Sequence, residues 1–377
     1  MKRLALQLLL STLITTACKE DFEPPVIQQG ASLLVVDGFI NNSSDTTMIR
    51  LSRTNKLGDG VRNSQEKGAS LFLEDSAGNT LYTFQELNDS GRYFIPGISL
   101  DINSKYRLRI VTSNSKQYLS DEIPVISTPA IDSISYGRMG NSFAVYANTH
   151  DPQNKTKYYR WEYTETWQYR ASFFSSLMVT SSGIIDRPPD KYVYECWKTQ
   201  QNTQLLLGSS AKLAEDLIYH YPLRTMDLNS IELSIKYFIF LRQYALPKEG
   251  YEYLENLKKI TEETGSLFDA QPSQLNGNIH GTAAKEEPVL GYLVASTPTT
   301  KQMYITNADV QPWDYNPGCV MFEVPAEAIA GAFTENSLIP LSLDGSAFSL
   351  KGIYATTYSC GDCTALGGVT TKPGFWQ

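Results

Sequence analysis

Short runs in which apolar and polar residues alternate, separated by turn-forming residues, fill the first third of the sequence. The first run is LLVVDGFI at 33–40, which ends at two asparagines and a serine. At 69–84, ASLFLEDSAGNTLYTF holds two alternating runs around a turn, the pattern of a β-hairpin. Three more short runs follow before residue 127, each ended by a glycine or an asparagine. Strands of this length, with turns every ~8 to 12 residues, favour an antiparallel β-sandwich.

A second β-rich region begins near residue 128. In YYRWEYTETW at 158–167, Tyr159, Trp161 and Tyr163 alternate with polar residues. Successive side chains of a strand point to opposite faces, so we expect this aromatic face to be buried against an opposing sheet. Further strands are expected at 191–198 and 231–246.

Two helices are expected inside this region. One spans about 246–265: Pro247 suits the first helical position, acids occupy the opening turn, and Gly265 can end the helix. A weaker pattern predicts a second helix at 211–221, capped by a serine and stopped by Pro222.

The strand order in 32–127 resembles the transthyretin-like and immunoglobulin-like modules of exported bacterial proteins. We therefore expect a mainly β fold, with an immunoglobulin-like or transthyretin-like sandwich at 32–127. A larger β-sandwich domain with the helical insertion should occupy 128–377. Two domains suit this length, because single domains usually hold ~100 to 200 residues.

The N-terminal segment has the pattern of a secretory leader. Lys2 and Arg3 precede an apolar stretch that ends at Ala17, too short to span a bilayer, which needs roughly 20 apolar residues. Cys18 follows directly, an arrangement that resembles the lipobox of bacterial lipoproteins, in which this cysteine is lipidated. We thus expect a signal peptide at 1–17 and a lipid anchor with a tether at 18–31. An ordinary signal peptide with an incidental cysteine is the alternative.

Charge and composition limit the partners. Removal of the leader takes away two basic residues, which changes the formal charge from −8 to −10. We expect no nucleic-acid partner, because affinity for phosphates depends on lysine and arginine. The 23 tyrosines fit strand and core packing, and a tyrosine-rich surface that stacks on sugars is the alternative explanation.

Four further cysteines suggest two disulfides in an exported chain. They are Cys196, Cys319, Cys360 and Cys363. Three pairings are possible, and the sequence does not choose between them. Cys360 and Cys363 form CGDC, which also admits a redox site or a share in a zinc site. The glycine-rich tail behind them cannot build the helix that lowers the thiol pKa in redox motifs, and a zinc site usually needs two close pairs.

No catalytic, metal or cofactor site is expected. His150, His220 and His280 have no partner at metal or triad spacing, and ordinary surface or packed histidines are favoured. Adjacent acids, such as Glu262 with Glu263, are common on solvated faces. Phosphate-binding glycine motifs are absent from the sequence, so no nucleotide cofactor is indicated.

Several longer segments carry a family resemblance. YECWKTQ, IKYFIFLRQYALPKEGYEYLENLKKITEETGSLFDAQPSQLNGNIHG, EPVLGYLVAS and CGDCTALGGVTTKPGFW are similar to a Bacteroidota lipoprotein family of unknown function, the domain of unknown function 4249 family. Members are usually encoded beside TonB-dependent, SusC-like transporters, which implies such a partner. Lys19, Glu20 and Asp21 after the cysteine resemble the acidic signal that exports lipoproteins of that phylum to the cell surface.

These features together predict a non-enzymatic lipoprotein of the outer membrane, lipid-anchored through Cys18 and facing the cell exterior. It would serve as an accessory or ligand-capture partner of a TonB-dependent transporter. One alternative is a surface hydrolase acting on glycan or peptide, with its acids assembled at the domain junction. Another is a structural protein of the cell envelope.

Overall fold

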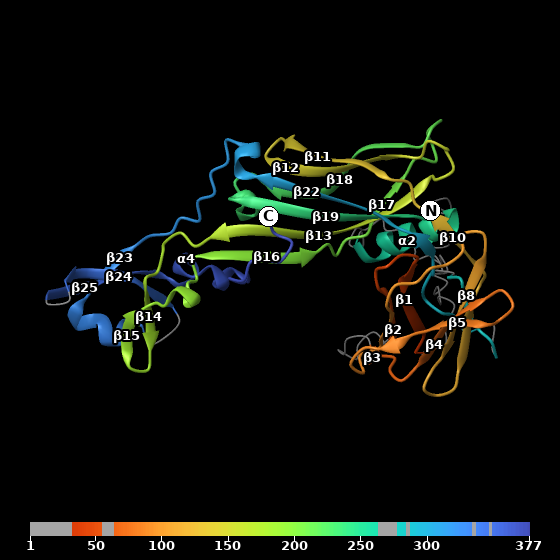
Figure 1. The fold of residues 1–377 in the computed structure, drawn as a ribbon, viewed down its shortest axis with the longest axis horizontal. Coiled ribbons are helices and arrows are strands. Elements are labelled where there is room, and N and C mark those ends of the chain that lie inside the picture. The colour runs from red at the N-terminus through yellow and green to blue at the C-terminus, as the bar shows by residue number, and fades with distance from the viewer. Residues whose placement is uncertain (1–31, 55–63, 263–276, 284–286, 334–336, 347–348) are drawn as a thin grey trace, which may run out of the picture.

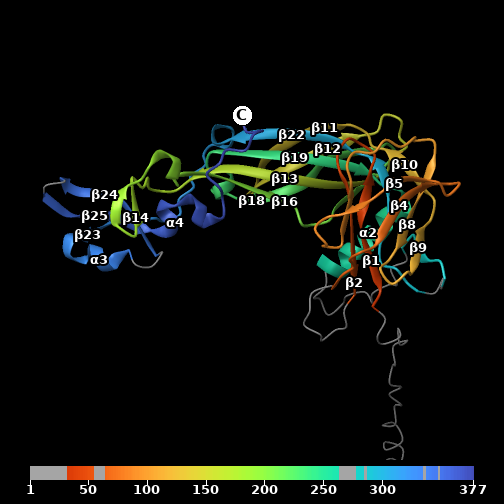
Figure 2. The same cartoon turned by 60° about the horizontal axis from the view of Figure 1, so that its bottom comes forward.

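The chain is mainly β and forms three units, an N-terminal unit, a central sandwich and a distal lobe (Figure 1). The computed structural model describes residues 32–54, 64–262, 277–283, 287–333, 337–346 and 349–377. The central sandwich lies between the other two units in both views (Figures 1 and 2). The expected leader and tether at 1–31 fall outside the described residues. Within those ranges, no helix has the length and apolar character needed to cross a membrane.

The N-terminal unit is one continuous set of paired strands that curls around its own core. Most of its strands come from the first part of the chain, and two come from much later. The strands are β1 (Leu34–Asn41), β2 (Thr47–Arg53), β3 (Ser64–Gln65), β4 (Ser70–Asp75), β5 (Thr80–Thr83), β6 (Gln85–Glu86), β7 (Arg92–Ile95), β8 (Lys105–Val111), β9 (Gln117–Ser120), β10 (Ile123–Ser127), β20 (Ile279–Gly281) and β21 (Ala295–Thr297).

The late strands correct the expected boundary of this unit. β21 lies between β1 and β10 and pairs with both in parallel. The Val36 amide donates to the carbonyl of Leu290 at 2.7 Å, and Ile279 and Leu293 are buried in the same core as β1. A contiguous domain at 32–127 would leave the backbone groups of two strand edges unpaired. The unit is therefore completed by residues 277–283 and 287–297.

The central sandwich packs a three-stranded sheet on a larger one. The smaller sheet has the order β11 (Ile131–Met139), β12 (Ser142–His150), β18 (Leu217–Asp227). The larger one has the order β16 (Glu195–Gln201), β13 (Tyr158–Arg170), β19 (Lys236–Ala245), β22 (Thr299–Thr306), with β17 (Leu206–Ser209) also paired to β13. As expected, Tyr159, Trp161 and Tyr163 of β13 are buried between the sheets.

The helix expected at 211–221 is wrong, because residues 211–216 form no helix and residues 217–221 belong to β18. Ile218 and Leu223 point into the core, and Tyr221 packs against it from the same strand. Pro222 is tolerated because β18 is an edge strand with a register shift beside this residue. The expected helix at 246–265 is present as α2 (Lys248–Glu262), directly after Pro247.

The distal lobe is a third unit that separates from the expected domain at 128–377 (Figure 1). It joins the hairpin of β14 (Leu177–Thr180) and β15 (Gly183–Asp186) to a sheet of β23 (Phe322–Pro325), β25 (Ser349–Thr357) and β24 (Leu338–Ser346). Short helices α3 (Ile329–Ala332) and α4 (Tyr358–Gly361) complete it. A small apolar set, including Leu177, Ile339 and Ile353, forms its interior.

Candidate functional site

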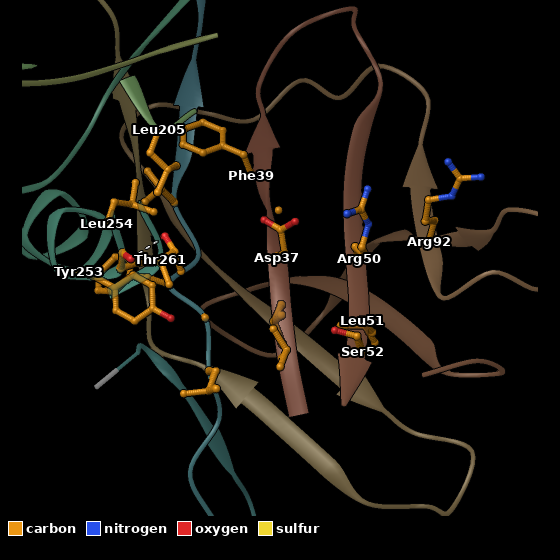
Figure 3. Close-up of a pocket in the computed structure, with 18 of the residues that line it drawn as sticks. Asp37, Phe39, Arg50, Leu51, Ser52, Arg92, Leu205, Tyr253, Leu254 and Thr261 are labelled. Atoms are coloured by element: carbon orange, nitrogen blue, oxygen red, sulfur yellow. Dashed lines mark hydrogen bonds between the residues drawn. The ribbon is translucent and has the colours of Figure 1, made fainter. Parts of the chain in front are cut away.

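A groove lies between the N-terminal unit and helix α2 (Figure 3). Its volume is about 1090 Å³. One wall is formed by β1, β2 and β7, and the other by α2 with residues 290–294. Arg160, Thr203 and Leu205 of the central sandwich also line the groove. Clefts between structural units are common places for ligand sites. We call this site the interdomain groove.

Three charged side chains form a row across the strand wall. The pairing register places Asp37 of β1 opposite Arg50 of β2, and Arg50 opposite Arg92 of β7. All three are exposed. The Arg92 Nε donates to the Ser90 hydroxyl at 3.2 Å. Within the described chain, Asp37 and Arg50 make no side-chain hydrogen bond and no ion pair.

Two arginines opposite each other destabilise a sheet, because like charges repel across strands. Asp37 can neutralise only one of Arg50 and Arg92, so this wall carries a net positive charge. The charge and the planar guanidinium groups suit a carboxylate or a phosphate.

The opposite wall is apolar and belongs to α2. Leu254 and Leu257 line the groove one turn apart. Tyr253 and Leu254 lie on this wall (Figure 3). The Tyr253 ring lies against Tyr292, with 5.7 Å between ring centroids. Burial raises the pKa of Tyr253, and the nearby Asp37 carboxylate adds to the shift. The tyrosine is therefore a neutral part of this wall at physiological pH.

Contacts on both sides fix α2 in place. Tyr251 packs on Tyr158 of the central sandwich at 4.9 Å between ring centroids. On the other side, residues 290–294 lie so close to β1 that a Cβ at Gly291 would be 2.2 Å from the carbonyl oxygen of Val36. With a φ of +151°, this position requires glycine. The groove is thus a preformed gap between two anchored walls.

Few ionisable side chains line the groove. Asp37 is the one carboxylate among the described residues that line it. In the described part of the chain, no three metal-ligating side chains come together. An apolar wall facing two arginines suits a ligand with an apolar body and an anionic group.

The residues proposed for anchoring and sorting cannot be placed. Cys18, Lys19, Glu20 and Asp21 all lie outside the described residues.

The four later cysteines form two disulfides, and the structure selects one of the three pairings. Cys196 of β16 bonds to Cys363, and Cys319 bonds to Cys360 within the distal lobe. Because Cys360 and Cys363 take different partners, neither the redox nor the zinc alternative describes CGDC.

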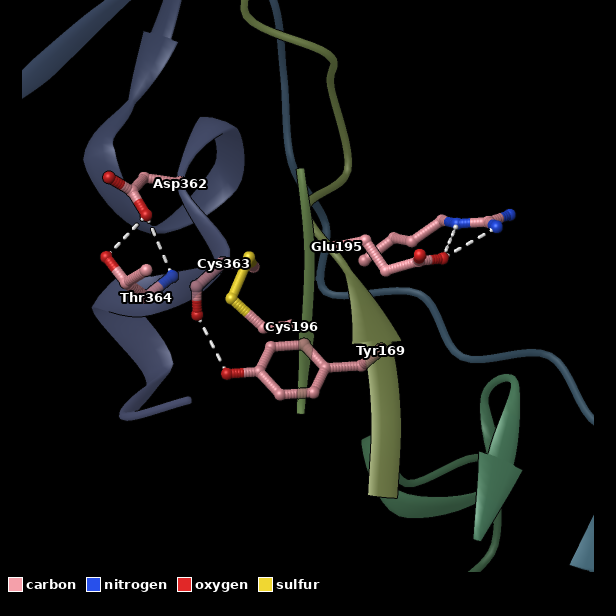
Figure 4. The surroundings of a disulfide bond; sticks show 7 residues. Tyr169, Glu195, Cys196, Asp362, Cys363 and Thr364 are labelled. Atoms are coloured by element: carbon pink, nitrogen blue, oxygen red, sulfur yellow. Dashed lines mark hydrogen bonds and ion pairs between the residues drawn. A yellow bond between two sulfur atoms is a disulfide. The ribbon is translucent and has the colours of Figure 1, made fainter. Parts of the chain in front are cut away.

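The surroundings of the first disulfide hold the C-terminal segment on the central sandwich (Figure 4). The Tyr169 hydroxyl donates to the Cys363 carbonyl at 2.8 Å. The Asp362 carboxylate accepts from the Thr364 amide at 2.8 Å and so begins the short helical turn that follows. This site is structural.

The histidines lie apart from one another. His150 forms an ion pair with Asp132 at 2.8 Å, and His280 lies 3.3 Å from Asp121. The Asp132 carboxylate raises the pKa of His150 through its hydrogen bond and its charge. His220 stacks between aromatic neighbours on the outside of β18.

Sequence reasoning missed two sets of residues. The charged row of the groove is formed only by strand pairing, so no local sequence pattern predicts it. The second set surrounds Glu165, which is buried between the sheets beside Arg224 and Tyr237. The sequence does contain a pattern that predicts this buried charge. Glu165 continues the alternation of Tyr159, Trp161 and Tyr163, so it places a carboxylate on an aromatic face.

Comparisons with known proteins match the chain to one family model and find solved structures of low similarity. A family model described as Domain of unknown function (DUF4249) matches residues 19–302. A search of curated proteins finds no match. The alpha-2-macroglobulin of Escherichia coli activated by porcine elastase matches 58% of this chain and 19% of its own, at 11% identity and a TM-score of 0.19.

A Bacteroides uniformis protein, named as a candidate carbohydrate binding protein, matches 58% of this chain and 92% of its own, at 13% identity and a TM-score of 0.15. The chain spans about a fifth of the macroglobulin. At these TM-scores neither likeness bears on ligands or activity.

Proposed function

The chain belongs to the family described as Domain of unknown function (DUF4249), and on that premise we propose that it is a non-enzymatic lipoprotein of the outer membrane. It faces the cell exterior and captures a ligand for a TonB-dependent, SusC-like transporter. Cys18 carries the lipid, and Lys19 to Asp21 direct the protein to the surface. Two acyl chains or more give stable anchoring, since each buried CH₂ contributes about 0.8 kcal/mol.

The observation that carries this proposal is the interdomain groove. Its walls are preformed, one is apolar, and the other presents Arg50 and Arg92 with Asp37 as the single acid at one end of the row. These features favour an amphiphilic anion as the captured ligand. The two disulfides agree with an exported protein, because disulfides persist in oxidising compartments.

The groove favours capture over hydrolysis. A glycosidase needs two carboxyl groups that face one cleft, about 5 to 9 Å apart. Asp37 supplies one carboxyl group, and none of the other described lining residues supplies a second.

Co-purification from native membranes tests the proposed function. The full chain, tagged at its C-terminus and expressed from its own locus, should bring down a TonB-dependent transporter after mild detergent extraction. The matched control is Cys18→Ala, which should leave the membrane fraction and recover no transporter. Repeated failure of the unaltered chain to recover any such transporter would refute the partnership. A Cys18→Ala variant that stays membrane-bound would refute the lipid anchor.

A further inference from the structure

A stack of three aromatic rings lies on the outer face of the three-stranded sheet of the central sandwich. His220 of β18 stacks on Tyr219, with 4.0 Å between ring centroids and 14° between planes. It also stacks on Tyr146 of β12, at 4.8 Å and 20°. The Tyr219 side is open to solvent, since this residue is 71% exposed. None of the three lines the interdomain groove.

An irregularity in β18 builds this stack. In a regular strand, Tyr219 and His220 would point to opposite faces. Here the register with β12 shifts on both sides of the Tyr146–Ala147 pairing, and His220 adopts a φ of 52°. Among the described residues with positive φ other than glycine, His220 alone lies inside a strand. Bulges of this kind re-aim side chains, and here the bulge brings two consecutive rings to one face.

A buried amide holds the bulge in place and links it to a polar row. The Asn148 Oδ1 accepts from the His220 amide at 2.8 Å. The Asn148 Nδ2 donates to the hydroxyl oxygens of Ser133 and Ser135 of β11, both at 3.0 Å. The serine oxygens act as acceptors in these bonds. Within the described chain their own hydrogens have no acceptor. Ser135 is the cross-strand partner of Tyr146, and Ser133 is that of Asn148.

We propose that this ring platform, made of Tyr146, Tyr219 and His220 with the hydroxyls of Ser133 and Ser135, binds an uncharged glycan, with a pyranose ring on the solvent-facing side of Tyr219. The C–H groups on the flat face of a sugar fit the electron-rich face of an aromatic ring. The two serine hydroxyls can donate to sugar oxygens at the edge of the stack. This site would operate independently of ligand capture in the groove.

The negative charge of the protein favours an uncharged glycan over the other ligands that stack on aromatic rings. Nucleic-acid bases also stack on tyrosine, but a protein with a mature formal charge of −10 repels the phosphates that accompany them. The platform itself carries no acid or base apart from the His220 ring. Its polar neighbours are hydroxyls and an amide, which match the hydroxyls of a neutral sugar.

Affinity electrophoresis of the purified mature chain tests this proposal. Native gels would contain laminarin, galactomannan, soluble starch or yeast mannan as uncharged probes, and polygalacturonate as an anionic one. The unaltered chain should be retarded by at least one uncharged probe. Tyr219→Ala should weaken that retardation roughly three- to tenfold, because one exposed stacking ring is lost. Tyr219→Phe keeps the ring and should retain most of it.

The matched control is Leu217→Ala on the same strand and the same face. Leu217 is 52% exposed but has no ring, so its loss should leave retardation unchanged. Leu257→Gln in the groove should also leave it unchanged, which separates this test from that of the proposed function. Three results would each overturn the proposal: no retardation by any uncharged probe, retardation by polygalacturonate alone, or equal losses for Tyr219→Ala and Leu217→Ala.

Discussion

Replacing Glu165 with leucine measures how the central sandwich accommodates a buried charge. The residue is 1% exposed and interrupts the aromatic face of β13. Its Oε1 accepts from the Gln200 amide at 2.9 Å. Its Oε2 accepts from the Tyr237 hydroxyl at 2.8 Å and from the Arg224 Nε at 3.2 Å. Leucine would leave all three donors without this acceptor.

The expected loss follows from what remains around Arg224. Removing one partner of a buried ion pair typically costs about 3 to 5 kcal/mol. Arg224 keeps a second carboxylate, Glu232, at 3.2 Å, and its side chain is 26% exposed. Both features reduce the expected loss of stability. Glu165→Leu should therefore lower the free energy of unfolding by about 3 kcal/mol, the low end of that range.

A double variant tests the cause. Arg224→Met in the Glu165→Leu background removes the charge that was left behind, and apolar replacement of a whole pair is often neutral. The Tyr237 hydroxyl still lacks its acceptor, so a loss of about 1 kcal/mol should remain. The double variant is therefore expected to be more stable than Glu165→Leu alone.

Tryptophan fluorescence during urea unfolding gives a local measurement. All five tryptophans of the chain lie in the central sandwich or pack on it, which leaves the N-terminal unit without one. The matched control is Glu162→Leu on the opposite face of β13, where the side chain is 37% exposed. That change should cost less than about 1 kcal/mol. Two results would refute the stabilising role of Glu165 as the partner of Arg224: a loss for Glu165→Leu no larger than that of the control, or a double variant that is the least stable of the series.

Three further predictions concern the disulfides, pH and packing. Replacing Cys196 and Cys363 with alanine should lower the free energy of unfolding by about 5 kcal/mol, from the entropy of a loop of 167 residues; a loss below 1 kcal/mol in urea unfolding would contradict this. The pKa of His150 should lie above 6.5 by NMR titration and move back toward 6.5 in Asp132→Asn. The unaltered chain should be more stable than Asp132→Asn, by the largest amount below pH 6.5. This difference in stability should vanish as the pH rises through the raised pKa of His150. Gly208→Ala would place a Cβ 2.6 Å from the ring of a buried tryptophan, so thermal unfolding should show a loss of about 1 to 3 kcal/mol, and an unchanged midpoint would refute that contact.

The strand-rich fold and α2 could be predicted because their signals are local. The aromatic alternation of β13 reports which face is buried, and Pro247 marks the start of α2. The helix predicted at 211–221 is wrong because a serine and Pro222 resemble helix boundaries, whereas the evidence for an edge strand from Leu217 onward lies in its pairing with β12. Local patterns cannot show which strand will be its neighbour.

The candidate sites were beyond prediction for the same reason. The interdomain groove needs β21 to insert between β1 and β10, and that pairing joins segments more than 150 residues apart. The row of Asp37, Arg50 and Arg92 exists only once the register is fixed. Its charges look like ordinary surface residues in the sequence, because each lies on its own strand between apolar neighbours.

Identifying the small molecules that co-purify with the protein tests directly whether it captures a ligand in the interdomain groove. The unaltered chain, Leu257→Gln and the adjacent Lys258→Gln would be purified from native cells, denatured, and the released small molecules identified by mass spectrometry. Leu257 lines the groove and Lys258 does not. We expect an anionic molecule with an apolar body from the unaltered chain and from Lys258→Gln, with at least a tenfold loss from Leu257→Gln. Equal recovery from all three chains, or none from the unaltered chain, would contradict it.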